Sequence, residues 1–412
     1  METIIKTEKT PPNKRISVID ALRGFALLGV MLIHMLQHFG AFSGVRVDKS
    51  QYPILDEAIQ WLSTNVIMGR FINIFALLFG LSFYIQMDRA ACKGIDFRKR
   101  FLWRMLILFG IGMIGNSFFS QDILSIYAVF GVIMVFLFPL KNWTLILIAS
   151  LLLLGAPRLA IMGYNKITKT EQAVEEEETR QARVTPTTFI DTAKRHLTTG
   201  LQGKLNYQFG MNGRGYITMA LFILGLVIGR LQFFKDIELK QKRNAILFAS
   251  FLTTTIALSY ILNWIPQEPI SFRMLMNPNY EVPLVAVAVS ALYDLNVVAM
   301  SGTLALGFIV LYQFNPIGRY LGLITPYGRM GLTNYEMQGI VGSFLFSAWG
   351  LGAIFGTWGT TEVFVLGIAF YIIQAIISTL WLKYFLYGPL EWFWRTATYL
   401  KWQPLKKLRA HL

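Results

Sequence analysis

Long apolar stretches separated by short polar segments dominate the chain. Their lengths approach or reach the roughly 20 residues that a helix needs to cross a bilayer, and none shows the alternation typical of exposed strands. The pattern therefore predicts an all-α protein, a polytopic membrane helix bundle with about ten transmembrane helices. The predicted spans cover residues 17–40, 65–87, 101–120, 123–140, 143–162, 215–233, 245–264, 284–314, 330–349 and 362–386.

The predicted eighth span, 284–314, is interrupted by the polar sequence YDLN at 293–296. Two interpretations are open. The segment is either one long span or an interfacial or re-entrant piece followed by a span that begins at Val297.

Lysine and arginine collect at one end of the predicted helices, and such an excess marks the cytoplasmic side of a membrane protein. We therefore expect the N-terminus and the C-terminus to be cytoplasmic. No small-residue cleavage site follows the first span, so we expect it to be kept as a signal anchor. The segments that this orientation places in the cytoplasm are 14–15, 96–104, 235–243, 319, 329 and 401–409.

Composition agrees with a membrane protein. The chain is 54% hydrophobic and only 15% charged, against about 25% charged residues in an average soluble domain. The cytoplasmic basic segments account for most of the net charge of +15, so no nucleic acid is expected as a partner. A single cysteine, Cys92, excludes an intrachain disulfide. The chain has no Walker-type phosphate loop, so ATP hydrolysis is not expected. His34 and His38 have the spacing of two metal ligands on one helix face, but the sequence offers no further ligands beside them, so no metal is expected.

One long polar loop, at about 163–214, interrupts the bundle. We expect a single domain over residues 1–412, with this loop as an extracytoplasmic cap that faces the acceptor. The loop contains the run Glu175–Glu178, which lacks the spacing of a calcium-binding loop. A like-charge run of this kind favours a solvated segment.

The first span carries the most informative polar residues, Asp20, Arg23, His34 and His38. Charged groups at bilayer depth are costly and often mark a pathway or a reactive centre. Arg23 and His34 are eleven residues apart, which places them on nearly the same face of a helix about 16 Å apart along its axis. The structural alternative is that Arg23 extends to the headgroups and His34 is a packing residue.

Other polar residues fall within or beside later spans. Asp122 precedes an apolar run, where it is either an N-cap or a catalytic group. Glu336 needs a cation or water as partner, and two interpretations are open: structural pairing with Arg329 or Arg319, or a functional role. Glu391 and Arg395, four residues apart, predict an ion pair on a helix surface.

Five separated segments resemble the YeiB-like family of bacterial membrane proteins. The resemblance runs from Arg15 to Arg395 without the acidic loop, and it extends to a wider superfamily of transmembrane acyltransferases. It implies a bundle of ten or eleven helices in the bacterial cytoplasmic (inner) membrane. It also implies an acyl-CoA donor from the cytoplasm and a sugar, glycan or lipid acceptor from the other side. The matching segments are RISVIDALRGFALLGV, MGRFINIFALLFGLSF, SQDILSIYAVFG, GRMGLTNYEMQ and GPLEWFWR.

Arg23 and His34 match the arginine, ten residues, then histidine pattern of the O-acyltransferase branch of that superfamily. YeiB-like proteins commonly carry Asn where this chain has His34. The role of His34 therefore rests on the wider superfamily and on its chemistry.

Acyl transfer from a thioester needs a base for the acceptor proton and groups that bind the donor. We predict His34 as that base or as a transient acyl carrier, since imidazole titrates near physiological pH. Arg23 orients the donor or pairs with Asp20, and Asp122 is a further catalytic candidate. The residues predicted to bind acyl-CoA, most simply acetyl-CoA, are Asp20, Arg23, Arg70, Asn116, Arg319, Asn334 and Gln338.

The sequence therefore predicts an integral membrane acyltransferase. The alternative is a transporter or flippase for a small amphiphile or lipid-linked intermediate, since buried polar residues also suit a transport path. No second copy of the DxxRG segment with a deep histidine occurs in the second half, which favours the enzyme. A structural or sensory protein would not explain why arginine and histidine share one face. Membrane lipids are expected partners, and a homodimer is compatible with the sequence.

Overall fold

The computed structural model describes residues 16–39, 51–168, 188–275 and 280–407. Within these ranges the regular structure is helical, and the one β-bridge is an isolated contact between Phe385 and Lys406. The prediction of an all-α protein is confirmed.

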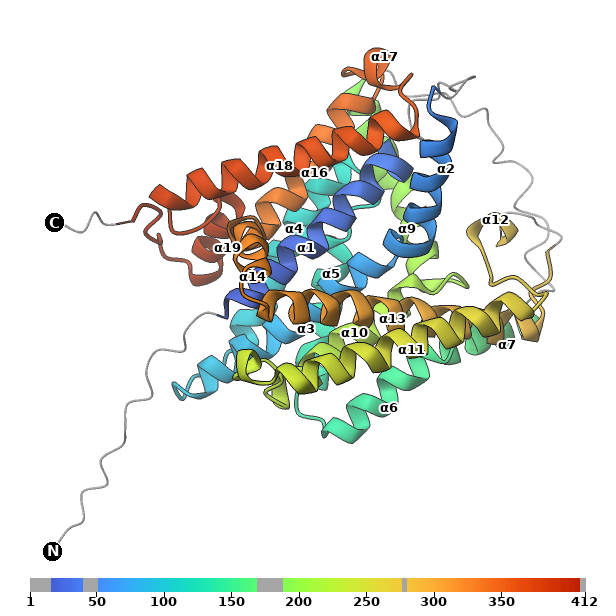
Figure 1. Ribbon diagram of the computed structural model, residues 1–412, viewed down its shortest axis with the longest axis horizontal. Helices are drawn as coiled ribbons and strands as arrows, with labels where there is room; N and C mark the ends of the chain where they lie inside the picture. The colour runs from blue at the N-terminus through green and yellow to red at the C-terminus, as the bar shows by residue number, and fades with distance from the viewer. Residues whose placement is uncertain (1–15, 40–50, 169–187, 276–279, 408–412) are drawn as a thin grey trace, which may run out of the picture.

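The helices follow one another with short connections (Figure 1). In chain order they are α1 (Ser17–Ile33), the π-helical η1 (His34–Phe39), α2 (Pro53–Leu62), η3 (Ser63–Ile67), α3 (Arg70–Ala91), α4 (Arg98–Phe118), α5 (Leu124–Leu137), α6 (Asn142–Leu153), α7 (Ala156–Thr168), α8 (Phe189–Arg195), η4 (His196–Gly200), α9 (Leu201–Phe209), α10 (Arg214–Arg230), η5 (Ile237–Leu239), α11 (Gln241–Trp264), α12 (Phe272–Leu275), α13 (Leu284–Gln313), α14 (Ile317–Leu321), η6 (Gly322–Ile324), α15 (Thr325–Arg329), α16 (Gly331–Phe346), α17 (Gly352–Phe355), α18 (Thr360–Tyr384) and α19 (Pro389–Tyr399).

Six helical segments in the described ranges are long and apolar enough to cross a membrane, and there are up to eight if each of two bent helix pairs is one span. Each of the ten predicted segments coincides with a helix or with a bent pair. However, α5 and α16 have only 14 and 16 residues. The molecule is thus a helical membrane protein, and the number ten stays a prediction.

The predicted eighth span is one continuous helix of 30 residues, α13. The interpretation as a re-entrant piece followed by a span is wrong. Asp294, in the polar YDLN sequence, is buried and forms an ion pair with Arg158 of α7, so the helix does not need to break there. The breaks occur elsewhere, at 53° between α6 and α7 and at 61° between α9 and α10. Gly155 and Gly213 lie at these two breaks with φ of 84° and 69°, a backbone region that favours glycine.

Helix α1 lies in the interior of the bundle, whereas α11 lies at its periphery against α13 (Figure 1). In the apolar window of α1, 78% of the residues are buried, compared with 6% for α11. Most of the α11 surface is therefore available to lipid. An interior helix is where charged side chains can be held by protein groups, so α1 is well placed to carry a site.

Small residues bring α3 and α10 together. A Cβ built on Gly80 of α3 would lie 2.0 Å from the carbonyl oxygen of Phe222, and one built on Gly225 of α10 would lie 2.1 Å from that of Leu77. Neither position tolerates a larger side chain without separation of the two helices. This close backbone approach is the packing that glycine permits in membranes.

Helices α14 and α19 and the first residues of α1 lie at one end of the molecule, the α19 end. Helices α2 and α17 lie at the opposite end, the α2 end (Figure 1). Helix α19 packs against α4, and its Trp394 Nε1 donates to the carbonyl oxygen of Arg104 at 2.9 Å.

The predicted ion pair between Glu391 and Arg395 is wrong. The Glu391 carboxylate accepts hydrogen bonds from the backbone N–H groups of Leu332 and Thr333 at 2.7 and 3.0 Å, so it caps the N-terminus of α16. The guanidinium of Arg395 lies instead over the ring of Tyr387, 5.2 Å from its centroid. The unsatisfied N–H groups at the start of α16 attract the carboxylate more strongly than a neighbour on the surface of α19.

The predicted cap at 163–214 is described in part. Its acidic run, Glu175–Glu178, lies outside the described residues. Helices α8 and α9, with η4 between them, pack against the bundle, where α8 and η4 contact α4. Lys204 of α9 is fully buried there. This part of the segment is thus an integral part of the helix packing.

Candidate functional site

Two cavities open on opposite halves of α1. The larger has a volume of about 730 Å³, lies toward the α2 end and includes His34 in its lining; it is called the His34 cavity. The smaller has a volume of about 290 Å³, lies toward the α19 end and includes Arg23; it is called the Arg23 cavity. The two residues singled out in the first span are therefore both at cavities, but not at the same one.

His34 begins the π-helical turn η1 and is 6% exposed. Its ring packs edge-on against Phe119 and Tyr335, with centroid separations of 4.8 and 5.8 Å. A π-helical turn widens the helix and is often found at functional sites. The residues of α1, α3 and α5 that line the cavity on the side of His34 are mostly apolar, with Gln37 as a polar exception.

The opposite side of the His34 cavity is polar. Arg158 of α7 and Asp294 of α13 form a buried ion pair of 2.6 Å. Arg158 also donates to the carbonyl oxygens of Met211 and Asn212, so the pair fixes the segment between α9 and α10. Sequence reasoning did not single out this pair, because its members are 136 positions apart.

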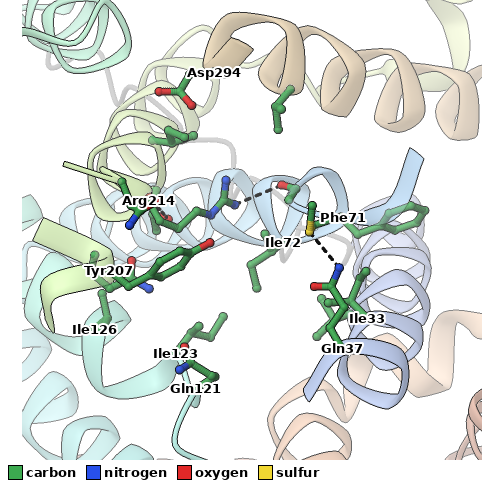
Figure 2. Close-up of a pocket in the computed structure, with 18 of the residues that line it drawn as sticks. Ile33, Gln37, Phe71, Ile72, Gln121, Ile123, Ile126, Tyr207, Arg214 and Asp294 are labelled. Atoms are coloured by element: carbon green, nitrogen blue, oxygen red, sulfur yellow. Dashed lines mark hydrogen bonds between the residues drawn. The ribbon is translucent and has the colours of Figure 1, made fainter. Parts of the chain in front are cut away.

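Arg214, the first residue of α10, extends into the same cavity. Its Nη2 donates to the carbonyl oxygen of Gly69 at 3.1 Å and to the side chain of Asn73. Figure 2 shows Arg214 and Tyr207 on one side of the cavity and Phe71 and Gln37 on the other. The cavity therefore has a cationic side and an apolar side.

Arg70, predicted to bind the donor, lies behind the cationic side. It is buried, its Nη1 donates to the carbonyl oxygens of Thr64 and Met68, and its guanidinium lies 5.9 Å from the ring centroid of Tyr293. Arg70 is at the N-terminus of α3, so the structure does not bring it to the Arg23 cavity.

In the other cavity, Arg23 forms an ion pair with Asp20 at 2.7 Å, which is one of the two roles that the sequence leaves open for it. Its second terminal nitrogen, Nη2, donates to Ser82 Oγ of α3 at 2.6 Å. Asp20 is buried, and Arg23 keeps about a quarter of its side-chain surface exposed. The guanidinium is therefore held in place and is still accessible from the cavity.

Two further arginines line the Arg23 cavity, Arg104 and Arg329, and neither is among the residues predicted to bind the donor. The guanidinium of Arg104 lies 3.6 Å from the ring centroid of Trp394. Glu391 is the one carboxylate that lines this cavity in the described part of the chain. The lining thus carries three arginines against one carboxylate, which favours an anionic ligand.

A layer of aromatic side chains separates the two cavities. Tyr335 lines the Arg23 cavity and touches the His34 ring. Tyr127 lines the His34 cavity and packs edge-on against Phe79, which lines the Arg23 cavity. A group that passes Tyr335 from the Arg23 cavity would therefore reach His34.

A buried polar cluster lies behind this layer. Lys204 Nζ donates to Asn116 Oδ1 at 2.6 Å, to the carbonyl oxygen of Asp122 at 2.8 Å and to Ser125 Oγ at 2.9 Å. The Asp122 carboxylate accepts from the N–H of Leu124, which agrees with its interpretation as a cap of α5. Asn116, predicted to bind the donor, is thus a partner of Lys204, a residue that sequence reasoning missed.

Glu336 is buried near α4, because a Cβ on Gly115 would lie 2.4 Å from its Oε2. The structure shows no ion pair between Glu336 and either Arg329 or Arg319 among the described residues, so the interpretation as structural pairing is wrong. Arg319 is exposed on α14 and lines neither cavity.

Asn334 and Gln338 join helices rather than line a cavity. Asn334 Nδ2 donates to the carbonyl oxygen of Tyr327 and to Ser378 Oγ, and Gln338 Nε2 donates to the Tyr327 hydroxyl at 3.0 Å. These contacts connect α15, α16 and α18. The side chain of His38 lies outside the described part of the structure. Among described residues, no group of three His, Cys, Asp or Glu is arranged to hold a metal ion.

The fold and its cavities define a class: a helical membrane protein with two arginine-containing cavities separated by an aromatic layer. A model of the family described as "Protein of unknown function (DUF418)" matches residues 228–401. This match begins in α10 and therefore does not include α1.

Whole-length relatives are found in bacteria. The chain is 27% identical to "Uncharacterized protein YxaH" of Bacillus subtilis, covering 97% of this chain and 98% of the relative. It is 26% identical to "Uncharacterized protein YeiB" of Escherichia coli, covering 92% and 95%. It is also 26% identical to "Uncharacterized 39.9 kDa protein in amylase 3'region" of Bacillus acidopullulyticus, covering 95% and 96%. These similarities support the YeiB-like resemblance.

Proposed function

We propose that this protein is a membrane acyltransferase, in which acyl-CoA enters the Arg23 cavity and an acceptor occupies the His34 cavity. The observation that supports the proposal most directly is the contact between His34 and Tyr335. A base in one cavity touches a side chain that lines the other. The thioester of the donor and the reacting group of the acceptor can therefore meet near His34 and Tyr335, one from each cavity.

The Arg23 cavity suits the acyl end of the donor. Its volume of about 290 Å³ accommodates an acyl group with part of the pantetheine arm, while the nucleotide stays at the rim. Arg23, Arg104 and Arg329 supply positive charge for the CoA phosphates. This set replaces most of the predicted donor residues and keeps Arg23 with its partner Asp20.

In the proposed transfer step His34 acts as the general base. His34 removes the proton from an acceptor hydroxyl or amine, and the acceptor atom attacks the thioester carbonyl carbon. The carbon–sulfur bond then breaks, and CoA leaves as a thiolate that takes up the proton. General-base catalysis of this kind contributes about 10²- to 10⁴-fold to the rate.

The proposed topology follows the distribution of basic residues. Ten spans place both termini and the α19 end in the cytoplasm of a bacterium, in its inner membrane. The His34 cavity then faces outward, where a sugar, glycan or lipid-linked acceptor is available. The acyl group is most simply acetyl, which fits the small Arg23 cavity.

Donor binding is the first test. The purified protein is heated with acetyl-CoA and with longer acyl-CoAs at concentrations well above micromolar, and we expect an increase in its unfolding temperature. Membranes that contain the protein are then given labelled acetyl-CoA, and we expect the label in a lipid or glycan fraction. The absence of both stabilisation and label would contradict the proposal.

A transporter or flippase is the second candidate, because two cavities separated by one layer of side chains also fit alternating access. Proteoliposomes without acyl-CoA distinguish the two functions. A transporter moves a labelled amphiphile across the bilayer in the absence of the donor. The proposed enzyme does not, and it modifies the amphiphile only when acyl-CoA is present.

A further inference from the structure

We infer that the His34 cavity binds an amphiphile whose head carries a phosphate or an equally anionic group, held at Arg214. That this amphiphile is the acceptor of the acyl group rests on the proposed function. The binding itself is independent of any acyl transfer. Its basis is the juxtaposition of a net positive charge and an apolar wall in one cavity.

The residues that line the His34 cavity carry a net positive charge. Arg158 and Asp294 form an ion pair, and the donors of Arg158 are also engaged with the carbonyl oxygens of Met211 and Asn212. Asp294 is the one carboxylate in the described lining, and it interacts electrostatically with Arg214 as well as with Arg158, so one negative charge is shared by two positive charges. Arg70, buried behind Tyr293, adds a further positive charge.

The guanidinium of Arg214 has N–H groups that can donate hydrogen bonds to a ligand. The side-chain hydrogen bonds of Arg214 in the described structure come from Nη2 alone, toward Gly69 and Asn73, and they fix the direction of the guanidinium. The Nη1 and Nε donors make no further hydrogen bond to the described residues. The side chain is half-buried at the cavity (Figure 2). An arginine held in this way can bind a phosphate through two parallel hydrogen bonds.

The rest of the cavity suits an apolar chain. Ile33 and Phe71 lie across the cavity from Arg214, Ile72 and Ile123 lie between the two sides, and Ile126 lies next to Tyr207 (Figure 2). A free inorganic anion would leave this wall in contact with water, which is unfavourable for so much apolar surface. A volume of about 730 Å³ accommodates a headgroup with the first part of a lipid chain.

The test measures the binding of phosphatidylglycerol, phosphatidylcholine, diacylglycerol and soluble glycerol phosphate to the detergent-purified full chain by native mass spectrometry. We expect phosphatidylglycerol to bind at least about tenfold more tightly than the zwitterionic and neutral lipids, because one charge-assisted contact supplies that factor. Glycerol phosphate should bind weakly, since it lacks the chain. Equal binding of all three lipids, or of glycerol phosphate and phosphatidylglycerol, would overturn the inference.

Three variants locate the site. Arg214→Gln should lower the affinity for phosphatidylglycerol by roughly tenfold to a hundredfold, and Arg214→Lys should lower it less. Gln121→Glu adds a negative charge at the cavity lining without removal of Arg214, and it should also weaken binding. Arg195→Gln, an exposed change on α8 outside both cavities, is the matched control.

The contacts of Arg214 join α10 to the start of α3, so a change at Arg214 can disturb folding. Gln121→Glu leaves these contacts in place and still tests the charge of the cavity. If Gln121→Glu and a folded Arg214→Gln variant bind phosphatidylglycerol like the wild type, the inference is wrong. If the lipid binds as expected but acyl-CoA neither stabilises the protein nor labels any lipid or glycan fraction, the proposed function fails and the anionic site stands.

Discussion

Arg23 and His34 project from the same helix, yet Arg23 lines one cavity and His34 lines the other. Arg23 is held by Asp20 and Ser82, and His34 packs against Phe119 and Tyr335. Helix α1 therefore contributes to the lining of both cavities. This arrangement gives each residue a separate role that mutation can distinguish.

Replacement of His34 by Ala should lower acyl transfer by about 10²- to 10⁴-fold and leave donor binding nearly unchanged, because a general base acts in the transition state. Turnover of labelled acetyl-CoA and thermal stabilisation by the donor measure the two effects. His38→Ala is the matched control, and the sequence predicts that it retains activity. Near-normal turnover of His34→Ala would mean that the histidine is a packing residue.

Replacement of Arg23 by Gln should weaken acyl-CoA binding as well as the rate. The change removes a positive charge from the Arg23 cavity and removes the salt bridge between Arg23 and the buried Asp20. A loss of about tenfold in donor affinity corresponds to one charge-assisted hydrogen bond. Arg89→Gln, exposed at the end of α3 and outside both cavities, is the control. Unchanged donor affinity in a folded Arg23→Gln protein would remove Arg23 from the donor site.

Replacement of Lys204 by Met should destabilise the protein, because Asn116, Ser125 and the Asp122 carbonyl would lose a common donor. Loss of a charged donor from a buried network costs about 2–4 kcal/mol. Thermal unfolding in detergent should show a midpoint several degrees lower than the wild type. Lys194→Met, an exposed change on the neighbouring α8, should leave the midpoint in place. Equal midpoints for the two variants would contradict a structural role of Lys204.

Replacement of Glu391 by Ala should cost about 1–2 kcal/mol of stability, since α16 would lose the carboxylate that caps its first turn. The same thermal unfolding assay measures this loss. Glu57→Ala, an exposed change on α2, removes a carboxylate without a cap and serves as the comparison. If Glu391→Ala unfolds like Glu57→Ala, the cap contributes no net stability.

Cys92, exposed in the turn between α3 and α4, gives a direct test of orientation. In intact cells an impermeant thiol reagent should not label the wild type, because the proposed topology places this turn in the cytoplasm. A Cys92→Ser variant with Thr198→Cys in η4 should be labelled from outside. The reverse pattern would invert the topology and exchange the sides from which the two cavities are filled.

Sequence reasoning identified the elements of the bundle and the polar face of α1, but it misassigned several partners. It paired Glu391 with Arg395, and in one interpretation Glu336 with an arginine, because those partners are near in the chain. In the fold, Glu391 caps α16 across 58 positions, at Thr333. Such a partner leaves no periodic signal in the sequence, so no pattern could have found it.

The sequence by itself determined that this is a helical membrane protein, where its apolar helices lie, and that Asp20 is within reach of Arg23 on one helix. These features depend on hydropathy and on spacing along one helix, which are local. Only the tertiary structure decided that α13 is unbroken, that Lys204 is buried and that Arg23 and His34 belong to different cavities. These features depend on contacts between helices far apart in the chain, because a buried charge is stable only where another helix supplies its partner.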